Sequence, residues 1–447
     1  MINFSNIGNH SYAWDIIMPY YRFALADAFF KERMVVGREN IPPPGTPTFV
    51  IANHQNSVND ALIIVSMFKD YRQPVSLARG DFFINNTVAK IFRFWRVMPT
   101  YRARDGGKSD IMKNLETFQI AHNILTKGGV IIMFPEAMHQ QGRFLGSFKK
   151  GVPRICFSAE EAADFHLNLQ ILPVNLHYSN IRLFREKALI EIGKPFGISE
   201  FFETFKNSPN EAYLQFNEKA RAILKSMVLH IEDIENYKAY DFLREMIRHE
   251  RIENNYKNYN YYDEFKEEKK VVAEIDSLKE NEPEKFQTLI SETNKYSELL
   301  LKLKFKDSLV NEKTTGFGMI AKSLLMVLYF PVFLFGFINN AIPTGFANLM
   351  TRKLKDKVFI GTFRFVLGFL LFPLWYIGIC IAASLISNSF ILGFSYTVLA
   401  FTSLFPFYSY RVNMLKLWHK WRFFLKRKTQ EVEQLKNLKE TILMFFK

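Results

Sequence analysis

Two residues of types that can carry out acid–base chemistry lie close together near residue 55. His54 follows a short apolar run, and Asp60 comes after five further residues, within the segment IANHQNSVND. A histidine can accept a proton near neutral pH, and a nearby carboxylate can orient its ring and stabilise the imidazolium that forms. The same residues have a structural interpretation, because Ser57 to Asp60 ahead of the run ALIIV matches a helix capping box. The pair alone therefore leaves a catalytic base and a helix cap both open.

The segments that must position this pair alternate between strand-like and helical patterns up to about residue 200. Five short apolar runs are typical of strands: TPTFVIAN, QPVSLA, GGVIIMF, NLQILPVNL and ALIEIG. Several are apolar on both faces, as in strands buried between helices. This alternation predicts an α/β domain over residues 35–200.

The composition of the 447-residue chain favours a membrane surface or a polyanion as partner. The formal net charge is +14, and 46 residues are phenylalanine. No RNA-binding module signature accompanies the basic and aromatic residues, so we expect no nucleic-acid partner. Two cysteines, Cys156 and Cys380, cannot form a disulfide framework, so we expect the α/β domain to face a reducing compartment. The N-terminal residues lack the basic and apolar regions of a signal peptide, and none is predicted.

Composition also predicts the regions that flank the α/β domain. Residues 1–34 are expected to form an amphipathic, aromatic-rich interfacial helix. Residues 201–312 carry dense mixed charge and are expected to form a solvated helical region. Residues 365–410 contain no charged side chain, and one membrane helix needs roughly 20 apolar residues, so a transmembrane hairpin that turns near residues 387–389 is predicted. The basic residues 411–447 are expected to form an amphipathic C-terminal helix.

The basic flanks of the apolar segments predict their orientation. The connection 352–364 and the start of the C-terminal tail are both basic, and positive flanks stay cytoplasmic. The α/β domain is expected on the same face, so the protein is predicted to be an integral membrane protein with that domain cytoplasmic. The uncharged stretch within 313–351 should then not cross the membrane once. We expect it to re-enter or to lie in the interface, with the break NNAIP at 339–343 as its turn.

Four motifs follow one another in the predicted α/β domain. They are HQNSVND at 54–60, VMPTYRAR at 97–104, IIMFPEAMHQQGRF at 131–144 and ILPVNL at 171–176, and FKKGVPRICFSA follows the third as a Lys-Gly entry into a helix. In order and spacing they resemble the motifs of the glycerolipid acyltransferase family, which includes glycerol-3-phosphate and lysophosphatidate acyltransferases. The resemblance covers roughly residues 35–200. It implies a mixed sheet flanked by helices, followed here by a helical region and C-terminal membrane helices.

Two features depart from the family pattern. The family usually has four residues between its His and Asp, which places Asn59 at the usual Asp position. We favour Asp60 as the partner of His54, because a neutral Asn would stabilise an imidazolium less, and we expect the turn before the helix to absorb the extra residue. The Gly-Thr or Gly-Ser pair that often follows the third-motif Glu is Ala137-Met138 here, which leaves the acceptor preference open.

The resemblance implies a membrane-bound O-acyltransferase of phospholipid biosynthesis. It would move an acyl chain from acyl-CoA or acyl carrier protein to glycerol 3-phosphate or 1-acyl-glycerol-3-phosphate, without a cofactor or a metal. His54 would be the general base, oriented by Asp60, and Arg102 would bind the acceptor phosphate with paired donors. Glu136 would contribute to acceptor binding, through a hydroxyl or by holding an arginine. The other residues expected to bind substrate are Arg104, Phe134, Pro135, Lys149, Lys150, Gly151 and Pro173.

Two alternative functions stay open. A lyso-aminolipid or another lysolipid as acceptor would keep His54 and Asp60 but would need no phosphate site. A non-catalytic membrane scaffold could retain the fold, although the intact His, Asp, Arg and Glu argue against it. The residues do not decide between the two glycerol-phosphate acceptors, or which acyl chain and donor are preferred.

Overall fold

The chain folds into two compact units. The first comprises residues 1–230 together with 356–362, and the second comprises 231–355 with 363–447. This computed structural model describes residues 2–68, 72–101, 108–136, 142–181, 183–254, 259–310, 315–354, 357 and 359–447.

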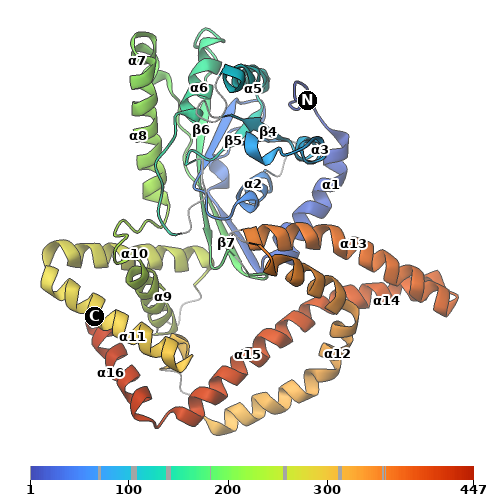
Figure 1. Cartoon of the computed structure of the whole chain (residues 1–447), viewed down its shortest axis with the longest axis vertical. Helices are drawn as coiled ribbons and strands as arrows, with labels where there is room; N and C mark the ends of the chain where they lie inside the picture. The colour runs from blue at the N-terminus through green and yellow to red at the C-terminus, as the bar shows by residue number, and fades with distance from the viewer. Residues whose placement is uncertain are drawn as a thin grey trace. The chain divides into compact units, whose positions relative to one another are not determined.

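The first unit is built around one seven-stranded sheet (Figure 1). The strand order is β1-β7-β6-β2-β5-β3-β4, and every neighbouring pair is parallel except β6 with β7. The strands are β1 (Glu32–Val36), β2 (Thr48–Ala52), β3 (Val75–Arg79), β4 (Val97–Thr100), β5 (Val130–Met133), β6 (Gln170–Tyr178) and β7 (Lys187–Ile192). The five runs predicted as strands form β2, β3, β5, β6 and β7, so the predicted mixed α/β sheet is confirmed.

Strand β2 lies in the middle of this sheet and leads directly to His54. All five of its residues are buried, and it pairs with β5 on one side and β6 on the other. An apolar strand of this kind suits the interior of a largely parallel sheet, where helices cover both faces. Its carboxyl end, and therefore His54, lies at the carboxyl edge of the parallel strands β2 and β5.

The helices of the first unit connect and cover these strands. They are α1 (Tyr12–Phe23), α2 (Val58–Val65), α3 (Asn86–Phe94), α5 (Lys108–Thr126), α6 (Gly151–Glu161), α7 (Phe202–Asn207) and α8 (Pro209–Met227). Short η segments are the π-helix η1 (Ala24–Phe29) and the 3-10 turns η2 (Arg38–Asn40), η3 (Gly80–Phe82) and η4 (Ser199–Phe201).

The N-terminal helix is shorter than predicted. A helix was expected over residues 1–34, but α1 starts at Tyr12 and the helical segment ends with η1 at Phe29. Residues 32–36 instead form the edge strand β1, because the run ERMVV pairs in register with β7. The outer face of α1 still exposes Tyr12 and Ile16, as an interfacial helix would.

Helices α7 and α8 belong to the sheet unit, which corrects the boundary predicted at residue 200. A charged helical region was expected over 201–312, but the buried face of α8 joins the core of the first unit. The residues of α8 in that core are Ala212, Phe216, Ala220 and Leu224. Their spacing of three to four residues forms one apolar stripe on a helix, and burying that stripe decides where α8 packs.

The helical region of the second unit consists of α9 (Tyr237–Asn254), α10 (Tyr261–Asn281), α11 (Pro283–Leu303), η5 (Asp307–Leu309) and α16 (Gln430–Met444). The single helix predicted over 411–447 is wrong, because α15 (Leu404–Lys426) ends before α16 begins. Lys439 of α16 is almost fully buried, with its Nζ 2.5 Å from Oε1 of Glu250 and 3.1 Å from Oδ1 of Asp307. The end of the chain therefore packs against helices that precede the apolar segments.

Three apolar helices of the described chain are long enough to cross a membrane. The first is α12 (Gly316–Arg352), the second is α13 (Phe359–Ser387), and the third runs through α14 (Phe390–Thr402) into α15. The predicted turn near 387–389 is confirmed, since Asn388 has a positive φ of 48° and Ser389 caps α14.

The turn predicted at 339–343 is wrong, because α12 continues through this segment (Figure 1). Pro343 has no N–H to donate to the carbonyl of Asn339 four residues before it. Nε1 of Trp375 in α13 donates to that carbonyl at 2.7 Å instead. Tyr376 also donates to Oδ1 of Asn340 at 2.6 Å. Partners from α13 therefore satisfy the groups that would otherwise end the helix.

Candidate active site

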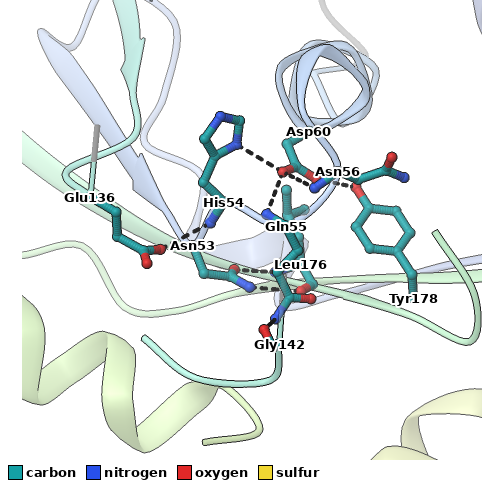
Figure 2. A network of polar contacts seen from close by, with 9 residues as sticks. All are labelled: Asn53, His54, Gln55, Asn56, Asp60, Glu136, Gly142, Leu176 and Tyr178. Carbon is teal, nitrogen blue, oxygen red and sulfur yellow. Dashed lines mark hydrogen bonds and ion pairs between the residues drawn. The ribbon is translucent and has the colours of Figure 1, made fainter. Parts of the chain in front are cut away.

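The end of β2 is fixed to β6, which places His54 at the edge of the sheet. The side chain of Asn53 donates to the carbonyl of Leu176 at 2.9 Å, and its Oδ1 accepts from the Leu176 N–H at 2.8 Å (Figure 2). Both residues are buried. This paired contact ends the regular strand and directs the next residue, His54, out of the sheet.

His54 and Asp60 are in direct contact, as the sequence predicted. Nδ1 of His54 lies 2.9 Å from Oδ2 of Asp60 (Figure 2). The Asp60 side chain is fully buried, whereas 18% of the His54 side chain remains accessible. A carboxylate on Nδ1 favours the tautomer that carries the proton there, which leaves Nε2 as the nitrogen able to accept a proton.

The carboxylate of Asp60 accepts several hydrogen bonds besides the contact with His54. Its Oδ2 accepts from the backbone N–H of Gln55 at 2.8 Å and of Asn56 at 2.7 Å. Its Oδ1 accepts from the hydroxyl of Tyr178 at 2.6 Å. These hydrogen bonds fix the orientation of the carboxylate, so that Oδ2 faces the imidazole.

The register of the first motif is therefore set by Asp60 rather than Asn59. The side chain of Asn59 is buried and makes no hydrogen bond within the described part of the chain. The extra residue is accommodated at Ser57, whose φ of 49° lies in the left-handed region that non-glycine residues seldom adopt. The capping box is not formed, because Ser57 makes no side-chain cap hydrogen bond. Asp60 instead accepts from the loop that precedes its own helix.

The Phe-Pro-Glu motif after β5 supports His54 from the other side. The ring of Phe134 stacks on the imidazole, with centroids 4.1 Å apart and planes 14° from parallel. Glu136 is buried, and its Oε1 accepts from the His54 N–H at 3.1 Å. Its Oε2 accepts from the Gly146 N–H at 2.6 Å. Glu136 therefore positions the backbone on both sides of the site, a role that the motif alone did not predict.

The remaining predicted residues divide into four groups. Pro135 and Gly151 have structural roles. The Pro135 carbonyl accepts from the Lys149 N–H at 2.8 Å, and Gly151 begins α6. Nζ of Lys149 contacts Ser147 and Nζ of Lys150 contacts Asn210, at 3.0 and 3.2 Å. Pro173 lies within β6, opposite Ile51 of β2. Arg102 and Arg104 lie outside the described residues, as do Ala137 and Met138.

Two residues of this site were not predicted from the sequence. Tyr178 lies 118 positions after Asp60, at the end of β6, and only its place beside the fourth motif could have suggested a role. Arg143 lies 3.1 Å from Nδ1 of His177 and donates to the Tyr178 carbonyl at 3.2 Å. It thus brings a guanidinium to the strand that carries Tyr178.

Neither a thiol nucleophile nor a metal centre is evident in the described residues. Cys156 is buried in the core, and burial raises the pKa of its thiol well above the usual range, so it is poorly suited to nucleophilic attack. Among the described residues, no group of three or more His, Cys, Asp or Glu side chains is arranged to hold a metal ion.

We predict that Tyr178→Phe lowers kcat about tenfold, because the hydrogen bond to a buried carboxylate is worth about 1.5–3 kcal/mol. Initial rates at saturating substrate measure the loss. Tyr21→Phe is a matched control, since the buried Tyr21 hydroxyl donates to the Leu62 carbonyl at 2.5 Å. An equal loss of kcat in the control would contradict a specific role for Tyr178.

Comparison with known proteins gives the same class for this domain. Residues 32–177 match the family model described as Acyltransferase. A 123-residue segment is 30% identical to glycerol-3-phosphate O-acyltransferase 2 of Saccharomyces cerevisiae and covers 27% of this chain and 16% of that protein. A 135-residue segment is 26% identical to the chloroplastic 1-acyl-sn-glycerol-3-phosphate acyltransferase LPAT1 of Arabidopsis thaliana and covers 30% and 32%. The chain thus spans less than a third of either relative.

One solved structure is also similar, the 1-acyl-sn-glycerophosphate acyltransferase PlsC from Thermotoga maritima. Its TM-score is 0.34 at 18% identity, over 50% of this chain and 81% of that one, which is too weak to support an argument. From the family model and the two sequence relatives, residues 32–177 form an acyltransferase domain. These matches support the resemblance to the glycerolipid acyltransferase family that the four motifs indicated.

Proposed function

We propose that the protein transfers an acyl chain from an acyl thioester to a hydroxyl of glycerol 3-phosphate or 1-acyl-glycerol-3-phosphate. The observation that carries this proposal is the contact between His54 and the buried carboxylate of Asp60, within a domain of the glycerolipid acyltransferase family. The two relatives that the domain resembles are named for these two acceptors. The donor would be acyl-CoA or an acylated carrier protein.

The proposed reaction needs a base, because an alcohol is a poor nucleophile until its proton is removed. Nε2 of His54 takes the proton of the acceptor hydroxyl as the oxygen attacks the thioester carbonyl. The carbon–sulfur bond then breaks, and the imidazolium returns this proton to the departing thiolate. The products are the ester and the free thiol, and no acyl-enzyme forms. Asp60 stabilises the imidazolium between the two proton transfers.

The acceptor hydroxyl needs to reach only Nε2, in the accessible part of the His54 side chain. The Asp60 side chain is fully buried, and Phe134 covers one face of the imidazole. The acceptor would therefore approach the ring from the edge that carries Nε2. Tyr178 and Glu136 act through the groups they hold, and we propose them as positioning residues rather than catalytic ones.

We propose that the acceptor phosphate is bound by Arg102, on the basis of the second motif and the paired donors of a guanidinium. Arg102→Lys keeps the positive charge but loses the paired N–H donors of the guanidinium. We therefore expect the apparent KM of the acceptor to rise about tenfold. The KM of the thioester should stay unchanged. Initial rates with each substrate varied in turn measure the two constants, and Arg93→Lys on the exposed face of α3 is the matched control.

A panel of acceptors tests the proposed substrate class. The purified protein would be incubated with a labelled acyl thioester and glycerol 3-phosphate, 1-acyl-glycerol-3-phosphate, a lyso-aminolipid or a phosphate-free lysolipid. Transfer confined to the first two is the expected result. Equal transfer to the phosphate-free acceptors would contradict the phosphate site and favour the lyso-aminolipid alternative. No transfer to any acceptor would favour the scaffold.

We also propose that the protein is bound to a membrane with its catalytic domain on the cytoplasmic face. The three long apolar helices support membrane binding, and Tyr12 and Ile16 of α1 are 79% and 81% exposed. An acyltransferase that makes a lipid product needs access to the bilayer. Its thioester donor is a cytosolic compound, which supports the cytoplasmic face.

A further inference from the structure

The first unit holds a cavity with several cationic side chains in its lining, away from His54 along the sheet. It has a volume of about 170 Å³. The residues that line it are Gly8, His10, Arg72, Gln73, Arg96, Ile124, Lys127, Gly129 and Val130. Val130 is the first residue of β5, whereas His54 follows the last residue of β2. Because β2 and β5 are parallel, the cavity lies at the amino edge of the sheet and the candidate active site lies at the carboxyl edge.

The backbone at Arg96 indicates that its side chain has a specific role. Arg96 follows the end of α3 with a φ of 57°, in the left-handed region where a glycine is usual. A non-glycine residue there carries a cost in backbone strain. Only 5% of Arg96 is exposed. The contacts of the guanidinium must therefore offset this backbone cost.

The hydrogen bonds of Arg96 go to backbone carbonyls rather than to a carboxylate in the described part of the chain. Its Nε donates to the Gln73 carbonyl at 3.0 Å, and its Nη1 donates to the Asn9 carbonyl at 2.9 Å. Nη2 makes no hydrogen bond to any described residue, although Arg96 lines the cavity. Burial lowers the pKa of Arg96 to about 10, against the opposing effect of nearby Asp15, and the group is still charged at neutral pH. A buried charge that no carboxylate contacts directly is costly, so an anion bound here would be stabilising.

The other cavity residues add to this positive charge. Lys127 is exposed in the turn between α5 and β5, and Arg72 also lines the cavity. Among the described residues that line the cavity, none is Asp or Glu. The nearby Asp15 already accepts from His10 at 2.7 Å and from Gln73 at 2.9 Å. The cavity therefore presents several cations and no carboxylate.

We propose that this cavity binds a phosphate group, which is separate from the acyl acceptor of the proposed reaction. Guanidinium and ammonium groups are the side chains that bind phosphate oxygens most strongly. Bound phosphate would connect the segment around residue 8, the strand edge at Gln73 and the turn at Lys127. The group could belong to free phosphate or to a lipid headgroup, because α1 begins two residues after His10 and exposes Tyr12 and Ile16.

Phosphate binding is tested by thermal unfolding of the full chain in detergent. Inorganic phosphate is titrated against chloride at constant ionic strength, so that general charge screening stays the same. The Arg102→Gln background removes the phosphate site proposed for the acceptor. We expect a saturable rise in the unfolding temperature. Lys127→Gln should weaken the apparent phosphate affinity about tenfold, because one charge-assisted contact is lost. Arg93→Gln, an exposed cation that does not line the cavity, is the matched control.

Lys127 is the residue to change because its exposed side chain can be replaced without disturbing the fold, whereas Arg96→Gln can also fail to fold. No saturable stabilisation, or equal affinities in the Lys127→Gln and Arg93→Gln variants, would overturn the proposal. Competition by vesicles distinguishes the sources. Displacement of phosphate by phosphatidate vesicles but not by phosphatidylcholine vesicles would support a lipid headgroup, and no displacement by either would support free phosphate. Since the readout is binding, it does not depend on acyl transfer.

Discussion

His54→Ala should lower acyl transfer by about 10²–10⁴-fold while the protein still folds and inserts into membranes. The imidazole is the one group of the site that the proposed mechanism uses to move a proton. Its partly accessible position makes a large loss of stability unexpected, although its contacts with Asp60 and Phe134 disappear. Transfer of a labelled acyl chain to the preferred acceptor, with purified protein at matched concentration, measures the loss.

Asn59→Ala is the matched control for this prediction. Asn59 lies in the same loop and is fully buried, but its side chain has no hydrogen bond within the described chain. We expect the variant to retain most of the activity. Near wild-type turnover in His54→Ala would contradict the proposed role of His54 as the general base. A loss in Asn59→Ala as deep as that in His54→Ala would instead show that the register set by Asp60 is not the active one.

Of single-cysteine variants at Lys306, Lys357, Asn388 and Lys428, only the one at Asn388 should react with an impermeant thiol reagent applied to intact cells. The variants would be made in a Cys156→Ala, Cys380→Ala background. All four sites are exposed in the structure. The expected pattern places both ends of α12, and both ends of the α13–α14 hairpin, on the cytoplasmic face.

Three structural observations support this topology. No helix long and apolar enough to cross a membrane precedes α12 in the described chain. The helix α16, after the last apolar segment, is held to Glu250 and Asp307 by the buried Lys439. Residues 356–362 belong to the first unit, and a Cβ on Gly361 would meet the carbonyl of Ile181. These contacts are expected if the flanks of α12 and of the α13–α14 hairpin lie on the same face of the membrane.

This arrangement requires α12 to enter and leave the membrane on one face even though it is one helix of 37 residues. Pro331 and Pro343 lie inside it, and proline is the usual cause of a bend in a helix. Moving the basic connection after α12 across the bilayer would also be unfavourable. Labelling at Lys357 from outside would show that α12 crosses fully, and the re-entrant arrangement would then have to be abandoned.

Much of the fold and of the site could be predicted because the determining interactions are local in the sequence. The apolar runs of β2, β5 and β6 are buried on both faces, and burial of such runs specifies strands wherever the chain places them. The turn at Asn388 likewise follows from a polar break between two apolar helices. The strand β1 was missed because the run ERMVV is short and charged at one end, and its partner β7 lies about 150 residues away.

From the sequence alone it could be predicted that His54 lies just after a buried strand, that the Phe-Pro-Glu motif follows another, and that long apolar helices lie towards the C-terminus. Only the tertiary structure decided between Asp60 and Asn59, because the Tyr178 hydroxyl reaches Asp60 from a strand 118 residues later. It also decided that α12 continues past Pro343, since the partner of the Asn339 carbonyl comes from Trp375 of another helix. The physical reason is the same in both cases. A buried polar group needs a hydrogen-bond partner, and here that partner is distant in the sequence and brought near only by folding.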